Sequence, residues 1–429
     1  MSGAPLRVEK ALQLLPDLQV LAPLRSLVLS IARADVGMRW ASSGPYLTVG
    51  KRGVDTAELR GRVPQLLQRV GEHVAFLYRT YADALDAQQS GDPGRAVEAL
   101  LSAGEREESV RRWADAGAWY EAARPLAAAL QSRRAETECL LRLGRLRVQL
   151  GDHSDAARHF QRSLALAEAE FDQSAAVEAS RGLGDIALAQ GEWAGANAWY
   201  QRALRLAEAA SDARAIGQVQ HQFGRLAHQR GDLTGAGEQL RAARERFEQL
   251  GEVTELAGVL NSQGLVDAAL GRHGVALAAY REALAWAQRA PAAADLELSI
   301  RLNLVELALG TGRLLEAEEE LRRAEESAVA HDLAGRLVRV YGLMGRLRGL
   351  HGDETGFVFF EQAVELCHML GASPLDEAWV YHEYGLFRLR LGQGDEARAY
   401  LERAQELFGS LGKSLELERV RGDLERLTA

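Results

Sequence analysis

Residues 191–204 read GEWAGANAWYQRAL, and this stretch contains the pattern that decides the fold. Counted from Gly184, Ala196 follows after twelve residues, Tyr200 after four more and Ala203 after three more. The same pattern recurs along the chain in steps of 40 residues, with one step of 41. The position of the first glycine is taken in turn by Gly104, Gly144, Gly184, Gly224, Gly264, Leu304, Gly345 and Gly385. Such a period indicates stacked helical or strand units rather than one globular core.

Small residues at fixed spacing are typical of two helices that cross closely. The glycine and the alanine let the two backbones approach, and the larger residue one turn later fills the space beside them. A second glycine, seven or eight residues after the first, is typical of the left-handed residue that ends a helix. The alanines are Ala116, Ala156, Ala196, Ala236, Ala276, Ala317 and Ala397, and the helix-ending glycines are Gly151, Gly191, Gly231, Gly271, Gly312, Gly352 and Gly392.

The order glycine, alanine, aromatic or leucine, then small residue resembles the tetratricopeptide repeat. This resemblance implies an all-α fold in which pairs of antiparallel helices stack into a right-handed superhelix. The period of 40 residues is longer than the usual 34 of the family, as in its long-repeat bacterial members. Two positions depart from the pattern, because Leu304 replaces the glycine and Phe360 falls one residue early. We expect less regular packing at both.

The pattern also indicates where the array begins and ends. We predict repeats over residues 71–412, starting with a shortened hairpin at residues 78–105, and a capping helix over residues 413–429. The capping helix is predicted because apolar residues recur at helical spacing among charged ones. These apolar residues are Leu417, Val420, Leu424 and Leu427.

Residues 1–70 do not follow the repeat and have ten basic against five acidic residues, whereas the whole chain has a net charge of −9. Within them, Trp40, Tyr46 and Val49 flank a turn-rich centre, which predicts a short β-hairpin. A helix, a basic hairpin and the segment VDTAELRGRVPQLL (54–67) resemble the end of the winged-helix module of bacterial transcriptional activators. Two interpretations stay open: a remnant that contacts DNA, or an adaptor that caps the repeats.

In such a superhelix the first helix of each pair lines the concave side. Residues three before, one after and four after the first glycine point the same way. They include five arginines, which predicts a basic groove that recognises an acidic polypeptide segment, because a guanidinium pairs with carboxylates. Alternatively, these side chains are merely solvated, with some of them paired to acidic residues on adjacent repeats. The candidate binding residues are Arg145, Arg181, Asp185, His221, Arg225, His228, Asn261, Arg301 and Arg346.

Composition narrows the classes of function. Apolar residues make up 47% and charged residues 26%, which fits a folded soluble protein. Cys139 and Cys367 lie far apart, so we expect no disulfide framework and a reducing cytoplasm. We expect no membrane partner, because the first residues, MSGAPLRVEK, lack an apolar core and no stretch of about 18 apolar residues follows. Basic residues are almost all arginine, which is typical of a GC-rich bacterial genome.

Some segments of the chain match catalytic or metal-binding motifs only in part. GSLGKS (409–414) resembles the end of a phosphate-binding loop, but Leu407 stands where that motif needs glycine. His221 and His228 share a helix face with Arg225 between them, which disfavours a metal site. We therefore predict a non-enzymatic binding scaffold or regulatory sensor without a cofactor, or, as the alternative, a DNA-associated regulator whose repeats sense a signal. The partner's identity and the oligomeric state are not predicted.

Overall fold

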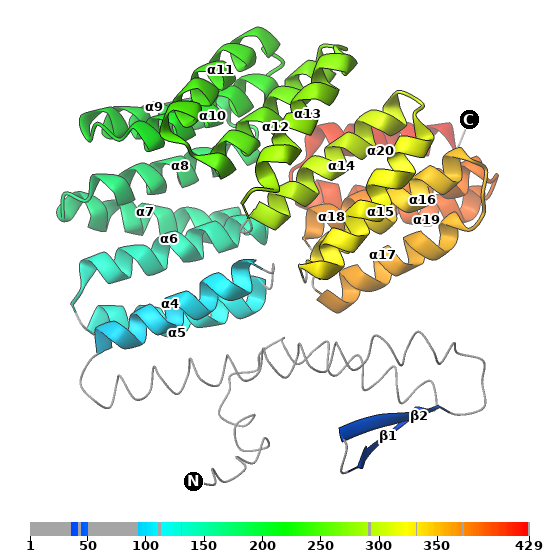
Figure 1. Cartoon of the computed structure of the whole chain (residues 1–429), viewed down its shortest axis with the longest axis horizontal. Coiled ribbons are helices and arrows are strands. Elements are labelled where there is room, and N and C mark those ends of the chain that lie inside the picture. Colours follow the sequence, from blue (N-terminus) through cyan, green and yellow to red (C-terminus); the bar gives the residue numbers. More distant parts are fainter. Residues whose placement is uncertain are drawn as a thin grey trace. The chain divides into compact units, whose positions relative to one another are not determined.

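The computed structural model describes residues 36–41, 44–49, 93–109, 113–129, 131–290, 293–331, 333–370 and 373–427. These residues are almost entirely helical, and they form two compact units that divide near residue 132 (Figure 1). The first unit contains β1 (Val36–Ala41), β2 (Gly44–Val49), α4 (Pro93–Ser109) and α5 (Trp113–Ala129).

In the first unit, β1 and β2 pair antiparallel, in a register that runs from Val36 opposite Val49 to Ala41 opposite Gly44. This is the hairpin that the sequence predicts. The rest of the basic segment, including the residues that resemble a winged helix, lies outside the described residues, as does the first part of the hairpin predicted for residues 78–105. In α4 and α5, Gly104 lies beneath the ring of Tyr120, so the repeat pattern begins here.

The second unit is a series of helical hairpins. Its helices are α6 (Arg133–Gln149), α7 (His153–Ala169), α8 (Gln173–Ala189), α9 (Trp193–Ala209), α10 (Ala213–Gln229), α11 (Leu233–Leu250), α12 (Val253–Ala269), α13 (His273–Ala287), α14 (Ala294–Gly310), α15 (Leu314–Ala330), α16 (Ala334–Leu350), α17 (Gly356–Leu370), α18 (Pro374–Arg390), α19 (Gly394–Ser410) and α20 (Ser414–Arg426). The even-numbered helices α6 to α18 are the first helices of the repeats, the odd-numbered helices α7 to α19 are the second helices, and α20 follows the last repeat.

Helix ends are set by the residues that the pattern singled out. Gly151, with φ of 77°, ends α6 in the left-handed region, and each of the other six predicted helix-ending glycines also has a positive φ. At the start of α7, the Asp152 side chain accepts a hydrogen bond from the backbone N–H of Asp155. Asp172, Asp212 and Asp232 cap α8, α10 and α11 in the same way. The predicted position of the helix breaks is therefore confirmed.

Close packing within each hairpin depends on the glycine at the crossing. A Cβ added to Gly144 would lie 2.8 Å from the ring of Phe160, and one added to Gly264 would lie 2.5 Å from the ring of Tyr280. Only glycine leaves room for the ring in these places. Phe360, although one residue early, still lies on Gly345, because α17 begins at Gly356 and the hairpin turn before it adjusts the register.

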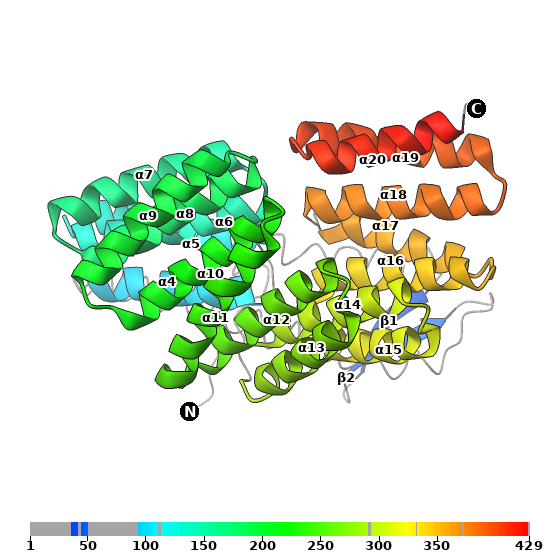
Figure 2. The same ribbon diagram turned by 90° about the horizontal axis from the view of Figure 1, so that it is seen from above.

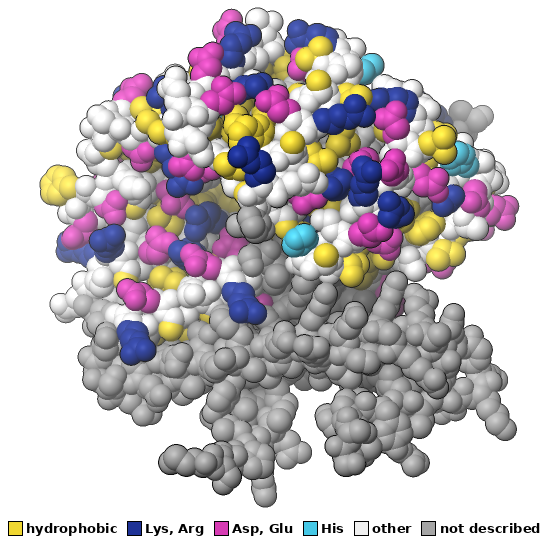
Figure 3. Space-filling model, viewed as in Figure 1, with side chains coloured by type: hydrophobic (Ala, Val, Ile, Leu, Met, Phe, Trp, Pro, Cys, Tyr) yellow, Lys and Arg dark blue, Asp and Glu magenta, His cyan; other side chains and the backbone are white. Residues whose placement is uncertain are grey.

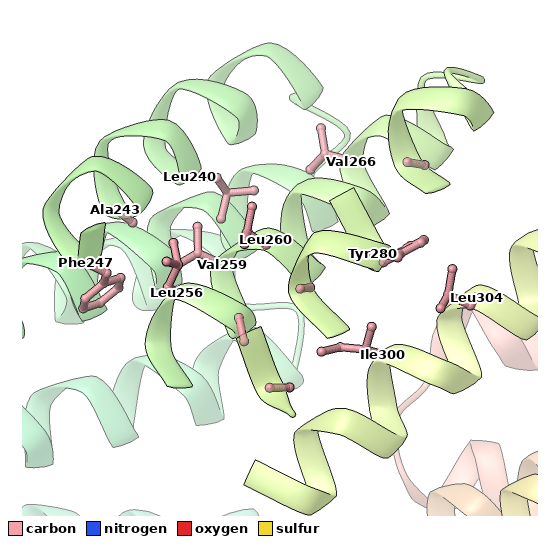
Figure 4. Packing of buried hydrophobic residues seen from close by; sticks show 14 of the residues in the cluster. Leu240, Ala243, Phe247, Leu256, Val259, Leu260, Val266, Tyr280, Ile300 and Leu304 are labelled. Carbon is pink, nitrogen blue, oxygen red and sulfur yellow. The ribbon is translucent and has the colours of Figure 1, made fainter. Parts of the chain in front are cut away.

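Leu304 packs differently from the glycine that it replaces. It joins a cluster in which residues of four consecutive helices meet, from Leu240 on α11 and Leu260 on α12 to Tyr280 on α13 and Ile300 on α14 (Figure 4). The larger side chain is accommodated because it faces the preceding repeat. At the other end of the unit, Val420 of α20 is fully buried in a cluster with residues of α18 and α19.

The first helices form the inner side of the array. Consecutive first helices, such as α6 and α8 or α16 and α18, contact one another, whereas the main contacts of the second helices are with first helices. Elements that lie closer together occupy the inner side of a curve, so the unit is a superhelix with first helices on its concave face. Figure 2 shows α16, α18 and α20 stacked in this way at one end of the unit.

Candidate functional site

One row of side chains follows the inner face across four repeats. The residue after the first glycine is Arg145 on α6, Asp185 on α8, Arg225 on α10 and Leu265 on α12, and all four are solvent-accessible. We call these four residues the inner stripe. Arg225 has the most exposed charged side chain of the four, at 45%. The equivalent residue of the next repeat, Val305, is fully buried, so the inner stripe ends at α12.

Polar bridges with side-chain hydrogen bonds join most consecutive even-numbered helices of the second unit, and between α16 and α18 Arg346 lies 3.8 Å from Glu383. They tie side chains that are 33 to 42 positions apart in the sequence, which is about one repeat. The bridges are Arg145–Glu178, Arg181–Gln218, Gln218–Glu255, His221–Ser262, Asn261–Asn303, Glu306–Arg346 and His382–Asp423. Several candidate binding residues therefore also hold the array together.

Asp185 is the centre of the polar contacts on α8 and α10. It accepts a hydrogen bond of 2.7 Å from the Tyr200 hydroxyl and one of 3.3 Å from the Gln222 amide. Burial, and then the charge of Asp185, raise the pKa of Tyr200, so the phenol stays protonated as the donor. Arg225 donates a hydrogen bond of 2.7 Å to the Gln222 amide oxygen and lies 3.8 Å from Asp185. Its guanidinium is held in place and keeps donors directed to solvent.

Both histidines of α10 are neutral at pH 7. Burial, and then the positive charges of Arg225 and Arg181, lower the pKa of His221 to about 3. Burial also lowers the pKa of His228. The Nε2 atom of His221 lies 2.7 Å from the Ser262 hydroxyl. The two rings therefore provide hydrogen-bonding groups but no positive charge.

Two candidate residues lie apart from the inner stripe. Arg301 is 7% exposed, and its guanidinium is enclosed by Glu297 at 2.8 Å and Glu320 at 2.8 Å. Arg346 pairs with Glu306 at 2.9 Å and lies 3.8 Å from Glu383. The structure thus brings together Arg181, Asp185, His221, Arg225, His228 and Asn261 on α8, α10 and α12, with Arg145 at one end of the row.

Acidic residues balance the arginines of this region. Arg145 and Arg181 lie next to Glu178 and Gln218, and Gln218 in turn contacts Glu255. The face of the molecule in Figure 3 likewise shows acidic and basic side chains interspersed. The groove is less basic than its arginines alone indicate. The sequence prediction counted three positions per helix and omitted Glu178 and Glu255, which reach the same face from one or more turns earlier.

The described residues contain no group of three or more His, Cys, Asp and Glu side chains placed to hold a metal ion. None of the helices within the described ranges combines the length and the hydrophobicity needed to cross a membrane.

Comparison with known proteins agrees with this architecture. Residues 141–213 match the family model described as tetratricopeptide repeat. No curated protein gave a significant match. A solved structure of a Rap protein in complex with competence and sporulation factor is similar, with 14% identity over 80% of this chain and 99% of that chain and a TM-score of 0.55. This likeness shows the fold. The family match does not include residues 1–70, so their winged-helix resemblance stays a prediction.

Two further solved structures resemble the chain less closely. Aspartyl phosphate phosphatase F from Bacillus subtilis is 11% identical over 78% of this chain and 94% of that chain, with a TM-score of 0.48. A signal transduction ATPase with a tetratricopeptide repeat sensor from Pyrococcus horikoshii is 14% identical over 82% of this chain and 55% of that chain, with a TM-score of 0.48.

Proposed function

Because the helical array of this protein consists of tetratricopeptide repeats, we propose that it is a regulatory or scaffold protein that binds a polypeptide segment along the inner face of α6 to α12. The observation that carries this proposal is the inner stripe. It offers one accessible side chain per repeat, at the same place on four consecutive first helices, and the bridges beside it hold those helices in register.

The dimensions of the inner stripe suit an extended segment. Neighbouring packed helices lie ~10 Å apart, and an extended chain advances about 3.3 Å per residue. Roughly nine residues would therefore span the distance from Arg145 to Leu265. A chain in this position would meet a charged or polar side chain at three repeats and the exposed Leu265 at the fourth.

An acidic residue in the segment is proposed because of Arg225. Its partners are an amide oxygen and a carboxylate at 3.8 Å, so donors of the guanidinium are available to a carboxylate of the ligand. His228 and Asn261 add neutral hydrogen-bonding groups nearby. This arrangement positions and discriminates a ligand, and we propose binding rather than catalysis. The buried positions of Cys139 and Cys367 fit the proposal of a cytoplasmic protein.

The related fold of the Rap protein supports the proposal in one respect. That protein was solved in complex with competence and sporulation factor, so an array of this fold can hold a ligand. Which ligand this chain holds is determined by its own inner side chains.

A display experiment tests the proposal. Random peptides of about nine residues, displayed on phage, are selected against the full-length protein, and enriched peptides are synthesised and titrated. We expect enrichment of peptides that contain Asp or Glu, and binding at least about tenfold weaker for Arg225→Glu, since a charge-assisted contact is replaced by repulsion.

The matched control is Arg241→Glu, because Arg241 is an exposed arginine on the second helix α11. This variant should bind like the wild type. Failure to enrich any peptide, or equal affinity of the Arg225→Glu protein and the wild type, would remove the inner stripe from the account.

A further inference from the structure

A cavity of about 470 Å³ opens at the other end of the second unit, outside the inner stripe. Its walls come from five helices: Glu306 of α14, Arg339 of α16, Trp379 of α18, Phe408 of α19 and Arg419 of α20 among others. This volume lies in the range of small-molecule sites in proteins. The lining combines apolar and charged side chains. The charged side chains that lack a hydrogen-bond or ion-pair partner indicate which chemical groups an occupant would carry.

Arg339 is held over an aromatic platform inside this cavity. Its guanidinium carbon lies 3.6 Å from the centroid of the Trp379 ring. The ring can lie there because residue 342 is glycine, and an added Cβ at that position would overlap the Trp379 ring. Trp379 also packs against three separate hydrophobic clusters, which fixes its orientation. Glycine, tryptophan and arginine thus form one preorganised unit.

The Arg339 guanidinium is short of hydrogen-bond acceptors. Its nearest carboxylate, that of Glu306, lies 3.8 Å away, beyond hydrogen-bond distance, and already accepts a hydrogen bond of 2.9 Å from Arg346. Arg339 makes no hydrogen bond to any other residue in the part of the chain that the structure describes. Burial lowers the pKa of Arg339, while the charges of Asp376, Glu306 and Glu383 act in the opposite direction.

The remaining basic side chains of the cavity differ in how well they are paired. The ring of His382 lies 2.9 Å from Asp423, and Arg346 is bound to Glu306. Arg419 is exposed at the rim and has no ion-pair partner among the described residues. Two guanidinium groups, one at the wall and one at the rim, are therefore available to an anion.

We propose that this cavity binds a small organic monocarboxylate, with the carboxylate on Arg339 and the apolar part against Leu375 and Trp379. A single negative charge is favoured, because Glu306, Glu383 and Glu416 also line the cavity and would repel phosphate or another multiply charged anion. An apolar part is favoured because Leu375 remains 40% exposed at the edge. This site is separate from the inner stripe and does not depend on the proposed peptide binding.

Calorimetric titration of the full-length protein tests this inference. The probes are benzoate and hexanoate, their uncharged amides, and inorganic phosphate. We expect both carboxylates to bind. The amides and phosphate should bind at least about tenfold more weakly, because the amides carry no charge and phosphate carries more than one negative charge. Arg339→Met should weaken carboxylate binding by about tenfold or more, since methionine keeps an apolar side chain of similar length but lacks the guanidinium that donates to the carboxylate.

Three further variants make the result specific. Arg421→Met changes an exposed arginine on the same helix as Arg419 but outside the cavity, and it should bind like the wild type. Arg241→Glu, at an exposed arginine of α11 outside both proposed sites, should also leave carboxylate binding unchanged. Gly342→Ala should weaken binding while Arg339 is still present, because it displaces Trp379. Equal binding of benzoate and benzamide, unchanged binding by a folded Arg339→Met protein, or no carboxylate binding at millimolar concentration would each overturn the proposal.

Discussion

Lys413 donates a hydrogen bond of 3.2 Å to the backbone carbonyl of Ala189, although 224 positions separate the two residues. Lys413 lies in the turn between α19 and α20, and Ala189 is the last residue of α8. A cation at the carboxyl end of a helix is favoured by the unpaired carbonyls there. In the same turn, Leu411 lies beside Gly151. The last repeat of the second unit thus returns to its first repeats, and the superhelical turn is joined at this point.

Removal of the Lys413 contact should loosen this junction. We expect Lys413→Met to increase amide hydrogen exchange in the turns at residues 150–153 and 189–192, because both turns face the α19–α20 turn. Burial lowers the pKa of His153 and Lys413 lowers it further, so the variant should also raise that pKa. Exchange mass spectrometry and histidine NMR measure the two effects. Arg421→Met is the control, and unchanged exchange in both turns would show that the contact does not join the ends.

The neutral state of His221 predicts a specific pH dependence of stability. Its pKa of about 3 in the folded protein is below the ordinary value of about 6.5 in an unfolded chain. As the pH falls below about 6.5, the unfolded chain takes up a proton that the folded protein does not, so the free energy of unfolding decreases. The contribution is roughly 1 kcal/mol per pH unit. Urea unfolding at pH 5, 6 and 7 gives the free energy of unfolding at each pH. This free energy should depend less steeply on pH for His221→Gln than for the wild type, and an equal pH dependence of the two proteins would contradict the assignment.

Glycine at the helix crossing should be required for packing. A Cβ at Gly184 would overlap the ring of Tyr200, so we expect Gly184→Ala to lower the free energy of unfolding by about 1–3 kcal/mol. Gly237 on α11 has open space around its Cα, and Gly237→Ala should instead stabilise the protein by roughly 0.5–1 kcal/mol through helix propensity. Thermal unfolding of both variants measures whether stability falls for Gly184→Ala and rises for Gly237→Ala. Equal effects would contradict the packing derived from the repeat pattern.

The stabilities of variants at Arg301 and Arg225 should distinguish an arginine that supports the fold from one that is available to bind a ligand. Arg301→Met leaves Glu297 and Glu320 without their buried cation, and we expect a loss of stability of about 3–5 kcal/mol. Arg225→Met, at an exposed position, should change stability by about 0.5 kcal/mol or less. Urea unfolding measures both. A destabilisation by Arg225→Met as large as that by Arg301→Met would mean that Arg225 supports the fold and is not available for a ligand.

The repeat pattern predicted the fold in detail because its information is local. The positions of the glycines, alanines and rings follow from contacts within one hairpin, and Phe160 on Gly144 shows that contact directly. The regular packing of Phe360 on Gly345, despite its shift by one residue, was not predicted, because it depends on the conformation of the turn before α17.

The candidate site was predicted only in outline. The periodicity identified which helices face inward, but the partners of the arginines lie about one repeat away, and pairs such as Arg145 and Glu178 depend on the pitch of the superhelix. Arg339 and Trp379 were missed because neither occupies the three counted positions. A signal was present: Gly342 stands where most repeats have a larger side chain, and a missing side chain on an inner face indicates that something else fills the space.

The central claim is that a polypeptide lies on the inner face of α6 to α12, and site-specific photo-crosslinking tests it most directly. A photoreactive amino acid is placed at Leu265 of the inner stripe or at Leu315, which is 82% exposed on the second helix α15, and each protein is irradiated with a display-selected peptide. The account predicts a crosslinked product at residue 265 and little or none at residue 315. Equal crosslinking at both positions, or crosslinking at residue 315 alone, would contradict it.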